Sequence, residues 1–137
     1  MMRKPDWDKH LLNWFRENEN RPFCWGSFDC ALAAAEAIEV QTGIDQAADV
    51  RGRYTSAKGA LTIIKKAGFA DLEDLVTDRL GPPLRNPRLA HRGDIVLGKL
   101  DNGPTLLVVM GLTAFGPAED GLQAIPMDRW MKAWRVG

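Results

Sequence analysis

The feature that most constrains the fold is a change of pattern near the middle of the chain. Before residue 81 the apolar residues recur at helical spacing, and after residue 92 they occur in short runs rich in Leu, Val and Ile. Gly81-Pro-Pro83 and Asn86-Pro87 lie between the two parts and break regular structure. Helices first and strands afterwards predict an α+β fold.

Four segments of the first part indicate helices. In the first of them Trp7, Leu11 and Trp14 recur at helical spacing. The second is alanine-rich and stops at Gly43, and Ser56 is suited to cap the third. The expected helices are Asp6–Glu19, Asp29–Gly43, Ser56–Gly68 and Asp71–Leu80.

Three short apolar runs of the second part indicate strands, which we expect at Asp94–Leu100, Thr105–Gly111 and Leu122–Pro126. The segments 101–103 and 116–121 separate these runs and contain turn residues, so the sheet should be antiparallel. Asp128–Trp134 is expected to form a last helical turn whose tryptophans lie against the sheet.

The length of 137 residues fits one domain over 1–137. We divide this domain into an N-terminal helix at 1–20, a helical half at 21–81 and a sheet half at 92–137. Apolar residues make up 45% and charged residues 26%, which is typical of a soluble globular chain.

Charge and cysteine content exclude several classes of function. Lys plus Arg equals Asp plus Glu at 18 each, so no overall field attracts nucleic acid or an anionic membrane. The N-terminus has no apolar stretch of the kind that a signal peptide or membrane span requires, so we expect synthesis in the cytoplasm and no membrane insertion. Cys24 and Cys30 do not match a zinc spacing, and His10 and His91 are distant, so neither a metal nor a cofactor is expected.

Cys30 is the residue most suited to chemistry, because it begins the predicted alanine-rich helix. Unpaired N–H groups and the helix dipole at that end favour a thiolate. Asp29 and Ser27 are suited to cap the helix, and the aromatic segment before them is suited to line a cleft. Two simpler interpretations stay open: Cys30 as a small buried hydrophobic residue, and Asp29 as a cap alone.

Four segments together carry a resemblance to a known family. They are Arg21–Cys30 (RPFCWGSFDC), Arg92–Leu97 (RGDIVL), Thr105–Gly111 and Asp120–Val136. In this order they resemble the NlpC-type cell-wall peptidases, whose aromatic-x-aromatic-Gly…Asp-Cys signature begins the core helix. The form Trp-Gly-Ser-Phe-Asp-Cys and the N-terminal helix are similar to a small subgroup from phage and prophage tail modules.

The resemblance implies a papain-like NlpC-type fold, in which the helix that bears the cysteine packs on a C-terminal antiparallel sheet. It implies Cys30 as the catalytic nucleophile of a cysteine peptidase or amidase. The cleft residues that it implies are Phe23, Trp25, Gly26, Asp29, Thr105, Leu106 and Gly116.

The catalytic triad of the family is incomplete in this sequence. The place of the histidine base holds Thr105 or Leu106, and the place of the residue that orients it holds Gly116. His91 should lie on the order of 20 Å away along the sheet, because each strand residue advances about 3.3 Å. His10 would reach Cys30 only through an unusual packing of the first helix.

Three hypotheses about function follow. In the first, the chain is a tail-assembly or cell-wall-associated component that binds phage-tail-type proteins or peptidoglycan peptides without cutting them, and it is incorporated in a phage-like particle. In the second, it is an active thiol peptidase or amidase on peptidoglycan stem peptides, and its base comes from another residue or subunit. In the third, the resemblance is coincidental and the chain is an unrelated α+β domain.

Overall fold

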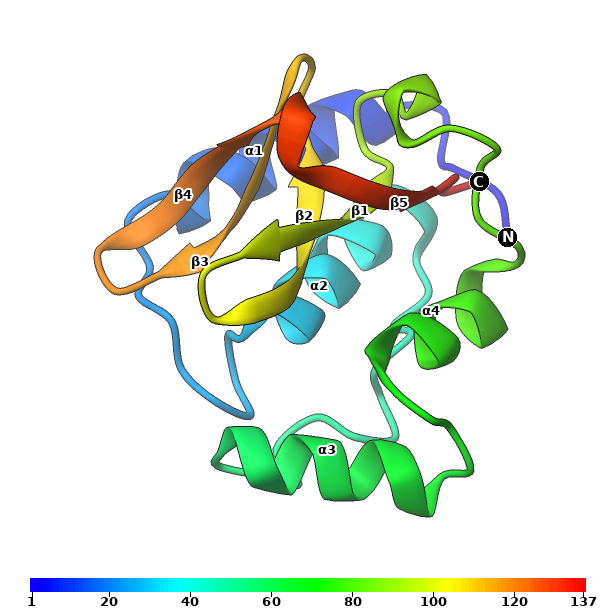
Figure 1. Ribbon diagram of the computed structural model, residues 1–137. Helices are drawn as coiled ribbons and strands as arrows, with labels where there is room; N and C mark the ends of the chain where they lie inside the picture. Colours follow the sequence, from blue (N-terminus) through cyan, green and yellow to red (C-terminus); the bar gives the residue numbers. More distant parts are fainter.

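Four helices fill the first part of the chain and a five-stranded sheet fills the second (Figure 1). This arrangement comes from a computed structural model that describes residues 1–137, and it confirms the predicted α+β class. The helices are α1 (Trp7–Asn18), α2 (Cys30–Thr42), α3 (Ala57–Lys66) and α4 (Leu72–Leu80). None of them is long and apolar enough to cross a membrane.

Short polar side chains define where three of these helices begin. Asp29, Ser56 and Asp71 are the N-cap residues of α2, α3 and α4, and each accepts a hydrogen bond from a backbone N–H in the first turn. Gly43 ends α2 in the left-handed conformation at φ 82°. All four predicted helices are therefore confirmed, with bounds shifted by one or two residues.

The sheet is antiparallel and has the strand order β4-β3-β2-β1-β5. Two helices, α1 and α2, cover one of its faces. The segment that precedes β1, which contributes Leu84 and Ala90, packs against the other face. The strands are β1 (Ile95–Leu100), β2 (Gly103–Val109), β3 (Thr113–Ala118), β4 (Gly121–Pro126) and β5 (Trp130–Trp134).

The prediction of a helical turn at Asp128–Trp134 is wrong. Only Met127–Arg129 forms a 3-10 turn, and β5 then pairs with β1. Trp130 and Trp134 are four residues apart, which mimics a helical period. They lie on opposite faces of the sheet, because the register between β1 and β5 shifts at Leu97 and Gly98.

The prediction of a turn over 116–121 is also wrong, because Gly116 lies inside β3 and the turn contains only Glu119 and Asp120. Gly116 is buried opposite β2, and a Cβ atom there would stand 2.7 Å from Cδ2 of Leu107. Glycine occurs both in turns and at strand positions where a neighbouring strand comes close, and the sequence alone does not distinguish the two.

Strand alternation divides the core into two layers. Leu97, Leu106 and Val108 face α1 and α2 in the larger cluster, whereas Leu107 and Val109 lie in the smaller cluster on the other face. A fully buried side chain of this size contributes about 1.5–3 kcal/mol. The larger layer fixes α2, and with it Cys30, against β2.

Helix α3 differs from the other helices because it contains no buried residue. Figure 1 shows it apart from the sheet, at the lower edge of the molecule, after the long connection that follows α2. Its apolar side chains include Leu61, which is 44% exposed, and the half-buried Ile63 and Ile64. The apolar face of α3 is therefore not part of the core.

The loop before α2 depends on Gly26, so we expect Gly26→Ala to destabilise the fold by at least about 2 kcal/mol. Gly26 has φ 81°, and a Cβ atom there would overlap the carbonyl oxygen of Tyr54. Gly52→Ala is the matched control: Gly52 has φ 76° but open space around it, so its cost should be about 1 kcal/mol. Urea unfolding of both variants measures the difference, and equal losses would contradict the predicted backbone clash.

Candidate functional site

Cys30 is the first residue of α2, and its side chain is half-buried. It lies where the larger core layer ends and an apolar pocket begins. The backbone of Leu106, on β2, is close enough to hydrogen-bond with its sulfur. The thiol therefore stands between the start of the central helix and the middle of the sheet.

Asp29, the residue before Cys30, is buried and fully engaged in hydrogen bonds. One carboxylate oxygen accepts from the backbone N–H of Leu32 at 3.0 Å. The other accepts from the backbone N–H of Gly26 at 3.0 Å and from the hydroxyl of Tyr54 at 2.6 Å. Asp29 thus joins the helix cap, the preceding loop and the segment before α3, and both of its carboxylate oxygens accept hydrogen bonds from groups other than Cys30.

The surroundings of Cys30 disfavour a thiolate. Burial, first, and the negative charge of Asp29 raise the pKa of Cys30 to about 11, although hydrogen bonding by the Leu106 backbone acts in the opposite direction. At neutral pH the group is therefore a neutral thiol. A cysteine nucleophile needs the reverse, a pKa near or below the working pH.

Neither histidine supplies the missing base. Nε2 of His10 lies 3.1 Å from a carboxylate oxygen of Asp6, the N-cap residue of α1. His91 is exposed and precedes β1, whereas Leu106 pairs with Leu97 well inside that strand. No histidine lines the pocket beside Cys30.

The structure brings together some of the residues that the sequence predicted for the cleft. Trp25, Asp29 and Cys30 line the same pocket. Phe23 supports Trp25 by an edge-to-face contact, with ring centroids 4.8 Å apart. Gly26 takes part through its backbone N–H, as described above.

The predicted residues of the sheet are placed differently. The backbone of Leu106 approaches Cys30, but its side chain lines a second, smaller pocket. Thr105 donates its hydroxyl hydrogen bond to the carbonyl of Gly103 on its own strand. Gly116 faces Leu107, on the side of the sheet away from Cys30. Neither Thr105 nor Gly116 lines the pocket beside the thiol.

The pocket beside Cys30 has a volume of about 200 Å³, and hydrophobic residues predominate in its lining. One wall is the apolar face of α3. The opposite wall comes from Cys30, from Trp25 and Pro104, and from Val50 and Tyr54. Sequence reasoning missed α3 and Tyr54 as parts of the site, because the helical spacing of Leu61 and Ile64 marks an apolar face but not what that face contacts.

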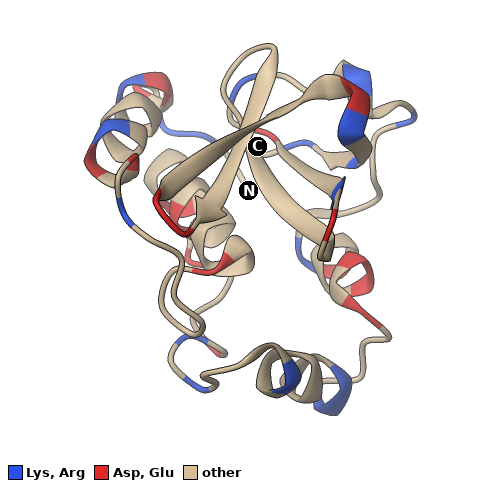
Figure 2. Cartoon of the chain, turned by 60° about the vertical axis from the view of Figure 1, so that its left-hand side comes forward, with Lys and Arg blue, Asp and Glu red and all other residues tan.

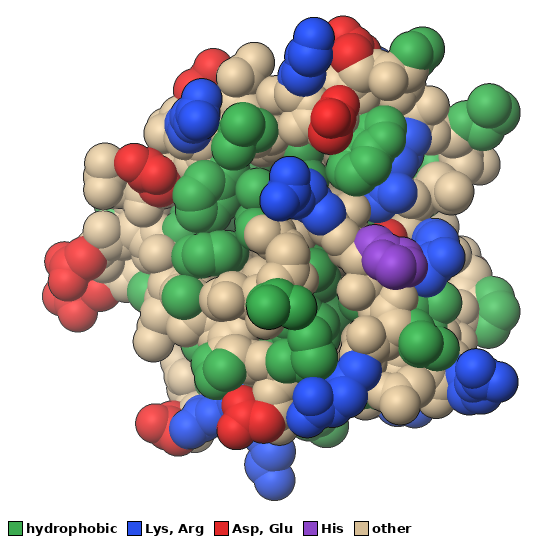
Figure 3. Space-filling view, turned by 90° about the horizontal axis from the view of Figure 1, so that it is seen from above, with side chains coloured by type: hydrophobic (Ala, Val, Ile, Leu, Met, Phe, Trp, Pro, Cys, Tyr) green, Lys and Arg blue, Asp and Glu red, His purple; other side chains and the backbone are tan.

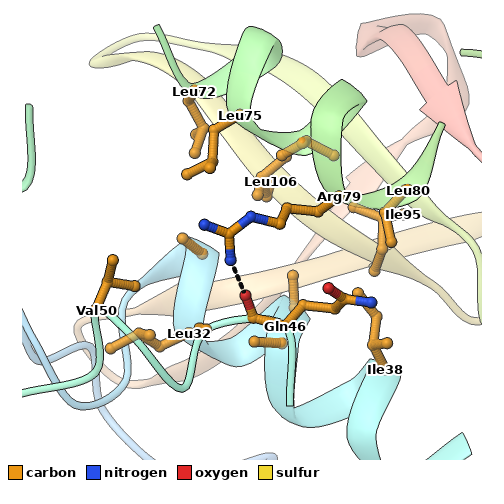
Figure 4. Close-up of a pocket in the computed structure, with 15 residues that line it drawn as sticks. Leu32, Ile38, Gln46, Val50, Leu72, Leu75, Arg79, Leu80, Ile95 and Leu106 are labelled. Atoms are coloured by element: carbon orange, nitrogen blue, oxygen red, sulfur yellow. Dashed lines mark hydrogen bonds between the residues drawn. The ribbon is translucent and has the colours of Figure 1, made fainter. Parts of the chain in front are cut away.

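A smaller pocket of about 70 Å³ continues the apolar surface between α2 and α4 (Figure 4). Arg79 of α4 lines both pockets, and Figure 4 shows it reaching across to the loop that follows α2. There Nη1 donates a 2.6 Å hydrogen bond to the carbonyl of Gln46, and the guanidinium binds Asp49 in a bidentate ion pair. These contacts hold α4 against the loop that follows α2, and residues of both segments line the two pockets.

The site contains no group of three or more His, Cys, Asp or Glu side chains close enough to hold a metal ion. Both cysteines are free thiols. The lining of the pocket is suited to enclose an apolar group next to the thiol of Cys30.

Comparison with known proteins gives one family. The model of the family described as "Domain of unknown function (DUF6950)" matches residues 2–136, which is nearly the whole chain. No curated protein matches the chain.

Proposed function

The chain belongs to the DUF6950 family of domains, and we propose that it is a papain-like, NlpC-type domain that binds a segment of a partner protein beside Cys30 without cleaving it. The arrangement of the helices and the sheet supports the proposed relationship to NlpC-type domains. A cysteine begins the central helix, and that helix packs on an antiparallel sheet whose second strand passes beside the sulfur.

One observation carries the proposal: an apolar pocket opens beside a thiol that has no base. A thiol with a pKa of about 11 is almost entirely protonated at neutral pH, and no imidazole is placed to remove its proton. Such a cysteine loses most of the rate advantage that a Cys–His pair supplies. What is left of the peptidase site is its capacity to bind.

The assembly that the sequence resemblance suggests is a phage-type or prophage-type tail, and we propose a structural role there. An exposed aromatic side chain at the mouth of the pocket suits such a role. Trp25 is 39% exposed, whereas Trp14, Trp130 and Trp134 are buried in the core. Tryptophan is enriched among the residues that dominate binding energy at protein interfaces.

We expect Cys30 to react with iodoacetamide at least about tenfold more slowly at pH 7 than a free cysteine peptide. Raising the pKa from 9.0 to about 11 reduces the thiolate fraction about a hundredfold, and the higher nucleophilicity of the more basic thiolate recovers about a factor of ten. The rate should keep rising up to about pH 11. The measurement uses Cys24→Ser protein, so that Cys30 is the only thiol.

The alternative function is an active thiol peptidase or amidase, which the placement of Cys30 at a helix N-terminus favours. It predicts alkylation faster than that of free cysteine at pH 7, with a plateau below pH 8. It also predicts that the purified protein releases stem peptides from peptidoglycan and that Cys30→Ala abolishes the release. Either result would overturn the proposal of binding without cleavage.

A further inference from the structure

The segment around α3 carries an uneven charge in a chain whose total charge is zero. Residues 50–70 contain five basic residues and no acidic one. Figure 2 shows only basic positions coloured on α3, at the bottom of the view, whereas red appears on the other helices. The face seen from above, away from α3, mixes basic and acidic side chains (Figure 3).

Only one of these five cations is held in an ion pair. Arg51 is engaged, because its guanidinium lies 3.1 Å from Asp45. The remaining four are exposed and make no ion pair within the chain: Arg53, Lys58, Lys65 and Lys66. A group of unpaired cations of one sign raises the local concentration of anionic ligands and attracts acidic partners.

The same helix forms a wall of the pocket beside Cys30. Leu61, Ile63 and Ile64 line it, and none of them is buried by the protein itself. A cavity of about 150 Å³ lined by apolar side chains is known to hold benzene. The pocket, at about 200 Å³, therefore has room for one large apolar side chain.

We propose that the partner segment is acidic and inserts a single large apolar side chain between α3 and Cys30, while its flanking carboxylates bind the four unpaired cations of residues 50–70. This inference rests on the proposed binding function and specifies its partner. Apolar anchoring supplies the affinity, and the charges select the partner and speed the encounter.

The geometry favours a peptide over a membrane surface. A helix that lies on a membrane turns its apolar face outward into the lipid. Here the apolar face of α3 lines a pocket that is closed on the other side by Val50, Tyr54 and Leu72. A single side chain can enter this pocket while α3 stays in place. A bilayer would reach the apolar face of α3 only if α3 moved away from the opposite wall.

The test is selection of binders from a library of random dodecapeptides displayed on phage, with the intact protein as bait. We expect enrichment of a large apolar residue flanked by Asp and Glu. The enriched peptide should bind at least tenfold more weakly to two variants, Leu61→Asp and the triple variant Lys58→Glu, Lys65→Glu, Lys66→Glu.

Two control variants make the same changes elsewhere on the surface. Leu112→Asp replaces an exposed leucine outside the pocket, and Lys9→Glu, Arg16→Glu, Lys99→Glu reverses three exposed cations that make no ion pair. Both controls should bind the peptide within twofold of the unchanged protein. All of these positions are exposed, so the variants should keep their unfolding midpoints.

The possible failures are distinguishable. Peptides that lose binding with Leu61→Asp but show no acidic bias, or no response to the triple Lys variant, overturn the inference and leave the proposed function standing. If the selection yields no peptide that binds the unchanged protein better than the Leu61→Asp protein, both the inference and the proposed function are overturned. Binding to phosphatidylglycerol vesicles that the triple Lys variant abolishes, with no peptide selected, overturns the inference in favour of a lipid surface.

Discussion

Replacing Asp94 with Asn is expected to destabilise the fold by about 3–5 kcal/mol, the cost of breaking a buried ion pair from one side. The carboxylate of Asp94 is fully buried and accepts three hydrogen bonds. Its donors are the guanidinium of Arg3 at 3.2 Å, the backbone N–H of His91 at 2.8 Å and the backbone N–H of Val136 at 3.0 Å. An amide replaces one acceptor oxygen by a donor, so at least one of these groups loses its partner.

The effect should be large because Asp94 joins both ends of the chain to the sheet. The two termini lie close together in Figure 1, and Arg3 also donates to the side chain of Gln41 at 2.9 Å. Gln41 in turn donates to the carbonyl of Gly93, so α2 is held in the same network. A buried network of this kind loses more than one pairwise contact when a central acceptor is removed.

Urea unfolding of Asp94→Asn measures the loss, and Asp101→Asn, at an exposed turn, is the control that should stay within about 0.5 kcal/mol. In a double-mutant cycle with Arg3→Ala, the two changes should be less than additive, because they remove the same ion pair. A loss below about 1 kcal/mol for Asp94→Asn would show that the carboxylate does not hold the termini.

The helical half could be predicted closely because its signals are local. Caps such as Ser56 and Asp71 act within one helical turn, and the glycine stop after α2 acts within one residue. The last strand could not be predicted in this way. The segment that contains Trp130 and Trp134 forms a strand because it pairs with β1, which is more than thirty residues away along the chain.

The candidate site was predicted on one side only. Trp25, Asp29 and Cys30 lie within one short segment of the sequence, so a single motif identifies all three. The opposite wall comes from Tyr54 and α3, which no motif marks and which the fold alone brings to the thiol. The basic, amphipathic pattern of residues 57–66 was visible in the sequence, but its position beside Cys30 was not.

Replacing Asp29 with Ala is expected to cost about 3–7 kcal/mol and to test how the site is held together. The change removes a helix cap, worth about 1 kcal/mol, and leaves the buried N–H of Gly26 and the hydroxyl of Tyr54 without an acceptor, at about 1–3 kcal/mol for each such group. Asp71→Ala is the matched control, because Asp71 is an exposed N-cap that accepts only from Asp74 and should cost about 1 kcal/mol.

Tyr54→Phe separates the tyrosine from the cap. It removes the 2.6 Å hydrogen bond to Asp29 and keeps the ring in the pocket wall, so we expect a loss of about 1.5–3 kcal/mol. If Asp29 joins the helix to the segment before α3, Tyr54→Phe should cost much less in the Asp29→Ala background than in the unchanged protein. Equal costs in the two backgrounds would mean that Asp29 only caps α2 and that the wall bearing α3 is positioned by other contacts.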